Sequence, residues 1–152
     1  MPHKEYFSWD RIHRDTQDLC GLLRAYGPFH GILAVTRGGL FPAGLVATFM
    51  DIRLIDTICI ASYGDDHTQK SFNIIKEPDI GDGAGWIVID DLVDSGETYR
   101  IIREKLPNAT FACLYAKPAG KPHTDIYLTD IAQDIWVVFP WEAEPDTGTG
   151  VV

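Results

Sequence analysis

The sequence contains few cysteines and no long hydrophobic run. Its three cysteines, Cys20, Cys59 and Cys113, are odd in number and far apart, which argues against a disulfide framework. No apolar run reaches the roughly 18 residues that a membrane-spanning helix needs, and the N-terminus lacks the apolar region of a secretion signal. We therefore expect reduced thiols and a cytoplasmic location.

Basic residues are also scarce. The chain has 13 Lys and Arg against 22 Asp and Glu, which gives a net charge of −9. Nucleic-acid binding depends largely on neutralising phosphates with basic side chains, and anionic membranes attract basic surfaces as well. We therefore expect no nucleic-acid partner, and we interpret most of the acidic residues as favouring solubility.

Several well-known binding motifs are missing. The sequence has no Gly-x-x-x-x-Gly-Lys-Ser/Thr loop and no Gly-x-Gly-x-x-Gly after a strand, so a P-loop hydrolase and a dinucleotide fingerprint are excluded. It has neither His-Glu-x-x-His nor Cys-x-x-Cys, the patterns that would indicate zinc.

What the sequence does contain is an alternation of apolar strand patterns with helical patterns. At 152 residues we expect one domain, spanning 1–152, with a substantial core. We expect helices at 9–26, 40–50 and 97–106, and strands at 31–35, 55–62, 72–76, 85–89, 110–116, 127–128 and 136–139. This order predicts an α/β fold, a mainly parallel sheet flanked by helices on both faces.

The most informative stretch runs from residue 85 to residue 98. A β-branched apolar strand pattern ends at Asp90 and Asp91, and Asp94 follows in a turn that leads through Ser95 to Thr98 and a helix. Ligands of open α/β sheets bind at the carboxyl ends of the strands, and a helix N-terminus favours a phosphate. Neighbouring strand residues point to opposite faces, so we expect the chain to turn here and bring the acids together. The stretch suits a phosphorylated sugar bound with Mg²⁺.

Two other strand ends carry polar groups. The loop from Thr36 to Gly39 offers free amides and the Arg37 guanidinium, and it is read equally well as an anion site or as a plain turn. Lys117 follows the strand at 110–116, and on its own it is an ordinary solvated lysine. Trp136, taken alone, is better interpreted as a core aromatic than as a ligand contact.

The stretch from Ile87 to Thr98 resembles the phosphoribosyl diphosphate motif of the phosphoribosyltransferases, with an apolar strand, two acids and a phosphate loop. Further segments are similar, in order and spacing, to the bacterial xanthine-guanine members of that family, and the resemblance covers nearly the whole chain. These segments are Ala34–Leu40, Thr57–Tyr63, Ala116–Gly120 and Trp136–Trp141.

The resemblance implies a type I phosphoribosyltransferase-like fold with a small hood and a mobile loop at 63–73, and a set of site residues. Asp90, Asp91 and Asp94 would be catalytic; Asp90 and Asp91 would hold the ribose hydroxyls and Mg²⁺, with Asp91 the closer metal ligand. A cis peptide would join Thr36 to Arg37. Phosphoribosyl diphosphate would be bound by Arg37, Gly38, Lys70, Asp90, Asp91, Leu92, Val93, Asp94, Ser95, Gly96, Glu97 and Thr98. The purine would be bound by Asp94, Lys117, Trp136 and Val137.

The activity that the resemblance implies is purine salvage. The enzyme would transfer the 5-phosphoribosyl group from phosphoribosyl diphosphate to guanine and xanthine, with hypoxanthine as a further candidate. Lys70 stands where the family usually has Arg, which keeps the charge but loses the bidentate fork. The family also implies a homo-oligomer, a tetramer or a dimer. Relatives that attach peripherally to the inner membrane end in a more apolar tail, so a purely cytoplasmic location is favoured here and peripheral attachment is the open alternative.

Two other functions remain open at this point. One is a non-catalytic regulator on the same fold that senses phosphoribosyl diphosphate and binds nucleic acid; the net charge of −9 counts against it. The other is a phosphotransfer domain, in which one acid of the Asp90–Asp91 pair would become an aspartyl phosphate.

Overall fold

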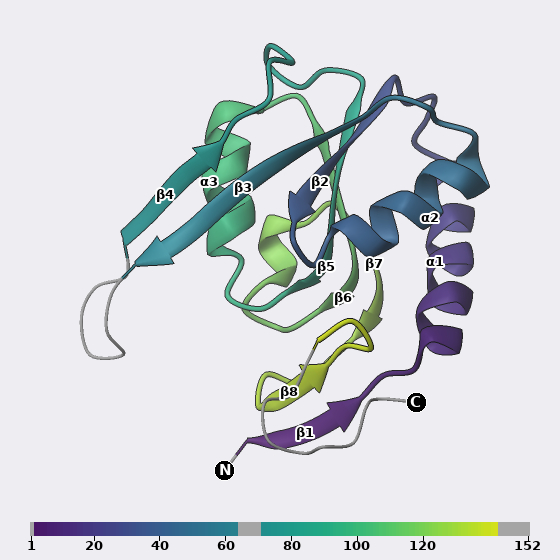
Figure 1. Cartoon of the computed structure of the whole chain (residues 1–152), viewed down its shortest axis with the longest axis vertical. Helices are drawn as coiled ribbons and strands as arrows, with labels where there is room; N and C mark the ends of the chain where they lie inside the picture. Colours follow the sequence, from purple (N-terminus) through teal and green to yellow (C-terminus); the bar gives the residue numbers. More distant parts are fainter. Residues whose placement is uncertain (1, 64–70, 143–152) are drawn as a thin grey trace.

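The computed structural model describes residues 2–63 and 71–142. Its main sheet has six strands in the order β4-β3-β2-β5-β6-β7, and only the β3–β4 pair is antiparallel (Figure 1). The strands are β2 (Gly31–Thr36), β3 (Ile55–Tyr63), β4 (Ser71–Lys76), β5 (Trp86–Val93), β6 (Thr110–Ala116) and β7 (Ile126–Asp130). The helices are α1 (Trp9–Leu23), α2 (Leu40–Met50), α3 (Glu97–Lys105) and the short 3-10 helix η1 (Lys121–His123). The predicted α/β architecture with a mainly parallel sheet is confirmed.

Alternate residues of the central strands pack into two separate cores. On β2, Ile32 belongs to a core with α1 and α2, whereas Leu33 belongs to a core with α3. On β5, Ile87 and Val88 divide between the same two cores. This follows from the two-residue period of a strand, because successive side chains point to opposite faces. Helices therefore cover both faces of the sheet, as the sequence predicted.

The first helix begins where expected but ends earlier. The Ser8 hydroxyl caps it by accepting a hydrogen bond from the Arg11 amide at 3.1 Å. The predicted end at Tyr26 is wrong, because after Leu23 the amides of residues 25 and 26 bond three residues back and tighten the chain into a turn. The buried face of α1 runs from Ile12 to Leu23, and Trp9 and Tyr26 are exposed.

A small second sheet forms the hood that the family resemblance implied. It consists of β1 (His3–Tyr6) and β8 (Ile135–Val138), which run parallel and pair His3 with Ile135 (Figure 1). Just beyond β8, the Trp141 ring stacks between Phe41 of α2 and Phe139, with centroid separations of 4.5 and 4.7 Å. Strand β1 was not predicted, because it is four residues long, largely exposed and paired with the opposite end of the chain.

Within residues 2–63 and 71–142, none of the helices is long and apolar enough to cross a membrane. The tail from residue 143 onward and most of the predicted mobile loop, including Lys70, lie outside the described residues. The flanks of that loop, Tyr63 and Ser71, belong to β3 and β4.

A buried polar contact ties α1 to the sheet. The Tyr115 hydroxyl of β6 donates to Asp15 Oδ2 at 2.6 Å, and the Arg11 Nε donates to the same oxygen at 3.3 Å. Burial raises the pKa of the Tyr115 phenol, and the adjoining Asp15 raises it further.

Removing this hydroxyl should destabilise the fold. Tyr115→Phe leaves the buried Asp15 carboxylate without one donor, so we expect the free energy of unfolding to fall by about 1–3 kcal/mol. Urea unfolding followed by circular dichroism would measure it. Tyr26→Phe is the matched control, because Tyr26 is 59% exposed and its hydroxyl should contribute little. Equal stability of the two variants would contradict the role given to Tyr115.

Candidate active site

A cavity of about 1150 Å³ lies where β2 and β5 end, below the hood. The loop after β2 contributes Arg37 and Gly38 to its lining, β5 contributes Asp90 and Asp91, and the hood contributes Trp136. Thr98, in the first turn of α3, also lines it. The cavity thus brings together residues from three of the segments that the sequence singled out, at the carboxyl edge of the sheet where ligands of such folds bind.

The two adjacent acids reach the same cavity without a turn between them. The prediction that the strand ends at these acids is wrong, since β5 continues to Val93. Its pairing with β2 stops at the Ala34–Ile89 pair, so the flank of β5 beside the two acids is no longer covered by β2. Each side chain accepts a hydrogen bond from the next backbone amide: the Asp91 amide donates to Asp90 Oδ1 at 2.8 Å, and the Leu92 amide donates to Asp91 Oδ1 at 2.6 Å.

Desolvation and mutual repulsion act on this pair. Burial has the largest effect on Asp90, and the neighbouring charge of Asp91 has the second largest. Both hold the pKa of Asp90 well above its ordinary value. Burial also raises the pKa of Asp91, against the opposing effect of its hydrogen bonds. Two carboxylates under these conditions favour a bound cation, which would relieve both effects.

The raised pKa values predict how the metal-free protein responds to pH. Because both carboxyls bind protons more tightly when the chain is folded, folding takes up protons above pH 3.8, the ordinary aspartate pKa. The contribution of the pair to the free energy of unfolding should therefore fall as pH rises from that value through the folded-state pKa values, and then level off.

An Asp90→Asn, Asp91→Asn variant isolates this contribution. In EDTA, it should be increasingly more stable than the wild type as pH rises from about 4 to 7. Chemical denaturation at several pH values would measure the difference. A difference that is independent of pH would contradict the raised pKa values.

The loop after β2 approaches the acids closely. A Cβ atom at Gly38 would overlap the Asp91 carboxylate, and one at Gly39 would lie 2.5 Å from the Ile89 carbonyl oxygen. Only glycine therefore fits at Gly38 while Asp91 keeps its place, and only glycine fits at Gly39 while the backbone of β5 keeps its place. The peptide between Thr36 and Arg37 is cis, as the family resemblance implied. Arg37 is exposed and lines the cavity.

The loop that leads into α3 is held from behind by η1. Gly96 has a φ of 85°, which favours glycine, and a Cβ there would overlap the His123 ring. The Ser95 hydroxyl accepts from the Glu97 amide at 3.3 Å, so this oxygen already stabilises the start of the helix. The loop is thus shaped both by its own backbone and by contact with η1.

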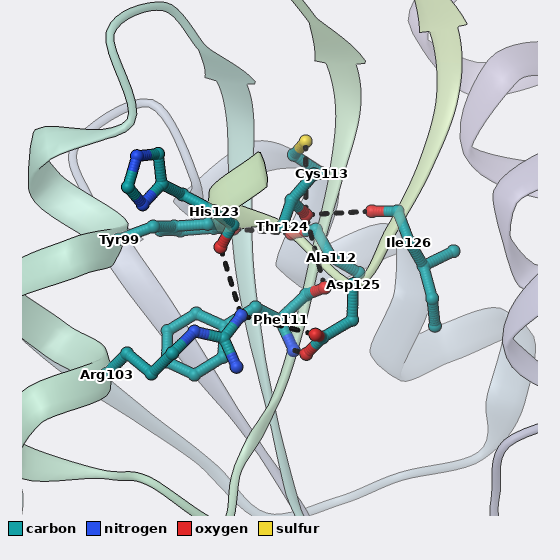
Figure 2. Close-up of polar contacts among 9 residues, drawn as sticks. All are labelled: Tyr99, Arg103, Phe111, Ala112, Cys113, His123, Thr124, Asp125 and Ile126. Carbon is teal, nitrogen blue, oxygen red and sulfur yellow. Dashed lines mark hydrogen bonds and ion pairs between the residues drawn. The ribbon is translucent and has the colours of Figure 1, made fainter. Parts of the chain in front are cut away.

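Figure 2 shows how η1 is attached. The Arg103 guanidinium of α3 donates to the His123 carbonyl at 3.0 Å and pairs with Asp125 Oδ1 at 3.3 Å. Asp125 Oδ2 accepts from the Phe111 amide of β6 at 2.8 Å. The place of His123 behind Gly96 depends on these long-range contacts, which no local sequence pattern indicates.

Lys117 and Asp94 form a separate polar contact. Lys117 is only 5% exposed, and its Nζ lies 3.2 Å from Asp94 Oδ2. The interpretation of Lys117 as a solvated lysine is therefore wrong. The other oxygen of Asp94 accepts from Gln133 Nε2 at 2.7 Å. Sequence reasoning missed Gln133, a polar residue in the short connection between β7 and β8.

The remaining predicted residues take different positions. Trp136 is 55% exposed, so its interpretation as a core aromatic is wrong. The Val137 side chain is buried, and Asp94, Ser95 and Lys117 are not among the residues that line the 1150 Å³ cavity. Leu92, Val93 and Glu97 contribute backbone and packing around the end of β5 and the start of α3 rather than cavity lining.

The donors at this site fit Mg²⁺. Among the described residues, no group of three or more His, Cys, Asp or Glu side chains could enclose a metal. Mg²⁺ does not require such a group, since it usually binds to one or two carboxylates and takes its other ligands from water and substrate phosphates. The two acids of β5 supply that number of carboxylates at the cavity.

Comparisons with known proteins agree with this geometry. Residues 9–147 match the phosphoribosyl transferase domain family. The chain is 51% identical to a xanthine-guanine phosphoribosyltransferase of Gluconobacter oxydans over 94% of its own length and 87% of that protein's. A purine phosphoribosyltransferase structure from Pyrococcus horikoshii superimposes with a TM-score of 0.80 at 28% identity, covering 93% of this chain and 96% of the other. The xanthine-guanine-hypoxanthine phosphoribosyltransferase of Helicobacter pylori gives a TM-score of 0.76 at 26% identity, covering 92% and 94%. The chain belongs to the phosphoribosyltransferase family.

Proposed function

We propose that this protein is a purine salvage enzyme. It transfers the 5-phosphoribosyl group from phosphoribosyl diphosphate to guanine and xanthine, with hypoxanthine as a further candidate, and releases the nucleoside monophosphate and diphosphate. The observation that carries the proposal is the Asp90–Asp91 pair in one cavity with Arg37, Gly38 and Trp136. The similar proteins of Gluconobacter oxydans and Helicobacter pylori are named for the same activity.

The two acids of β5 would act on the ribose. As the bond from the anomeric carbon to diphosphate breaks, its electron pair leaves with the diphosphate and positive charge develops on the ring. The carboxylates of Asp90 and Asp91 would stabilise that charge and bind the ribose hydroxyls, an electrostatic effect that is strong in a partly desolvated site. When bound at Asp91, Mg²⁺ would supply charge stabilisation to the departing diphosphate.

The phosphate groups would be bound by the two loops. Arg37, Lys70 and the Gly38 amide would hold the diphosphate, and the loop from Asp94 to Thr98 at the start of α3 would hold the 5′-phosphate. A cover over the reacting ribose would reduce hydrolysis by water. We assign that cover to the loop at 63–73, most of which lies outside the described residues.

The purine would bind between the hood and the strand ends. Trp136 would stack on the base, the backbone of Val137 would contact its 2-position, and Lys117 would donate to its exocyclic oxygen. A purine nitrogen attacks the anomeric carbon, and Asp94 would take up the proton that this nitrogen loses. The exposed Trp136 ring and the contact between Lys117 and Asp94 support these roles.

Removing the Lys117 charge should weaken the use of the purine substrate and leave the binding of phosphoribosyl diphosphate unchanged. We expect Lys117→Met to lower kcat/KM for guanine by roughly ten- to hundredfold, because a hydrogen bond from a charged donor is lost. The KM for phosphoribosyl diphosphate should stay near the wild-type value. Lys105→Met is the matched control, since that exposed lysine of α3 pairs with Glu77. Equal losses for both substrates would contradict the assignment.

A spectrophotometric assay tests the proposal. The wild-type protein is mixed with Mg²⁺, phosphoribosyl diphosphate and, separately, guanine, xanthine, hypoxanthine or adenine. We expect turnover with guanine and xanthine and little with adenine, which lacks an exocyclic oxygen for Lys117. Absence of turnover with every base would refute the proposal. The relatives give no support to a non-catalytic regulator or to a phosphotransfer domain.

We also propose that the enzyme acts as one domain per chain and as a homo-oligomer, a dimer or a tetramer. The exposed aromatic side chains of Trp9 on α1 and Phe41 on α2 lie beside an open apolar hollow and support self-association. Light scattering after size-exclusion chromatography should give a multiple of the 17.0 kDa chain mass. A mass equal to one chain would contradict this part.

A cytoplasmic location completes the proposal. All three cysteines are free, as is usual for proteins in reducing compartments. Cell fractionation should recover the protein with the cytosol, and recovery with the membrane pellet would contradict this location.

A further inference from the structure

Gln133 makes two hydrogen bonds that join the segments around the proposed purine site. Its Nε2 donates to Asp94 Oδ1 at 2.7 Å, and its Oε1 accepts from the Ala119 amide at 2.9 Å. A backbone amide can only donate, so the Ala119 contact fixes which end of the Gln133 amide faces the Asp94 carboxylate. The side chain therefore presents a donor, and not an acceptor, to Asp94.

The two contacts connect three parts of the chain. Asp94 follows β5, Ala119 lies in the loop that begins with Lys117, and Gln133 precedes the strand that carries Trp136. The Lys117 loop is closed on itself, since the amides of Gly120 and Lys121 both donate to the Lys117 carbonyl at 2.9 and 3.1 Å. The Lys117 amide also donates to the carbonyl of Val93, the residue before Asp94, at 3.0 Å, so the Gln133 contacts add a second link between the Lys117 loop and Asp94.

Lys117 and Asp94 have conflicting tasks in the proposed reaction. Without substrate, Lys117 Nζ contacts Asp94 Oδ2 at 3.2 Å. With a purine bound, the lysine must donate to the base, and the carboxylate must be free to accept the purine proton. The Asp94 side chain is 57% exposed, so little packing holds it in one orientation. An external donor on its other oxygen would keep the carboxylate from rotating into a fuller pairing with the lysine.

We infer that Gln133 is a positioning residue for the purine half of the reaction. It holds Asp94 through Oδ1, so that Oδ2 and Lys117 are available to the base. This role rests on the proposed function, because it has meaning only if Asp94 and Lys117 contact a purine. Gln133 itself does not need to touch the substrate.

Two substitutions separate the two hydrogen bonds. Gln133→Glu keeps an acceptor for the Ala119 amide but has no donor for Asp94, whereas Gln133→Met removes both contacts at similar size. Gln17→Glu makes the same charge change on the exposed face of α1 and serves as the control. Kinetics are measured with guanine varied at saturating phosphoribosyl diphosphate, then with the substrates exchanged, and thermal melting is recorded for every variant.

Both Gln133 variants should lose roughly ten- to hundredfold in kcat/KM for guanine, as expected for a lost hydrogen bond to a charged group. Their KM for phosphoribosyl diphosphate should stay within about twofold, and their melting temperatures near the wild-type value, because Gln133 is exposed. A purely structural tether would not produce this separation between the two substrates.

Several results would overturn the inference while leaving the proposed function intact. Wild-type kinetics in both variants would show that Gln133 has no role. Impairment of Gln133→Met alone would mean that only the Ala119 contact matters. Impairment of Gln133→Glu alone would mean that only the added charge matters. Equal losses for both substrates would likewise show a general structural role. An inactive wild-type protein would instead refute the proposed function, and this inference with it.

Discussion

The Asp90→Asn, Asp91→Asn double variant is expected to lose at least about a thousandfold in kcat while keeping its fold. The loss has two sources. The neutral amides cannot stabilise positive charge on the ribose ring, and they bind Mg²⁺ far less well than carboxylates do. Both acids lie in the same cavity wall, so replacing one alone would leave the other to compensate in part.

The fold should survive because asparagine keeps the local hydrogen bonds. The amides of Asp91 and Leu92 each donate to a side-chain oxygen that an asparagine also provides. Removing two charges whose pKa values are raised by burial should also relieve a destabilising effect. Circular dichroism and thermal melting in EDTA would show this. Asp18→Asn, Asp79→Asn is the matched control on exposed acids. Activity of the site variant within tenfold of the wild type would refute the role of the pair.

Gly38→Ala should reduce activity by about a hundredfold or more, although it adds a single methyl group. The new Cβ would occupy the space of the Asp91 carboxylate, so either the acid or the loop that carries Arg37 must move. A displacement of about 1 Å in groups that hold the reacting atoms is enough for a loss of this size.

The control for Gly38 is another glycine. Gly21 lies inside α1, and a Cβ there would meet no atom within 4 Å. Gly21→Ala should therefore keep full activity and raise the free energy of unfolding by roughly 0.5–1 kcal/mol, because alanine restricts the unfolded chain. Steady-state kinetics and urea unfolding of both variants would test the pair. Full activity of Gly38→Ala would contradict the close approach of the loop to Asp91.

Local patterns predicted the elements whose own residues decide their structure. Helix α2 and strand β6 have the predicted bounds, since each is a continuous apolar run between clear stop signals. The Asp90–Thr98 stretch was correctly expected at the carboxyl edge of a buried strand, because strand polarity follows from the alternation of strands and helices.

The features that were missed depend on contacts between distant residues. Strand β1 pairs only with β8, from the other end of the chain, and Lys117 is buried beside Asp94, which lies 23 residues earlier. The continuation of β5 past Asp91 depends on its pairing with β6. That pairing extends to the Val93–Ala116 pair, whereas the pairing of β5 with β2 ends at Ala34–Ile89. The role given to Gln133 has the same origin, since its partners come from two other loops.

The central claim is that the cavity at the ends of β2 and β5 transfers a phosphoribosyl group to a purine. The most direct measurement is to incubate the wild-type protein with phosphoribosyl diphosphate, Mg²⁺ and guanine, and to quantify nucleotide and diphosphate together by chromatography. We expect equal amounts of guanosine monophosphate and diphosphate, and neither product from the Asp90→Asn, Asp91→Asn variant. Diphosphate without nucleotide, or equal yields from the variant, would contradict it.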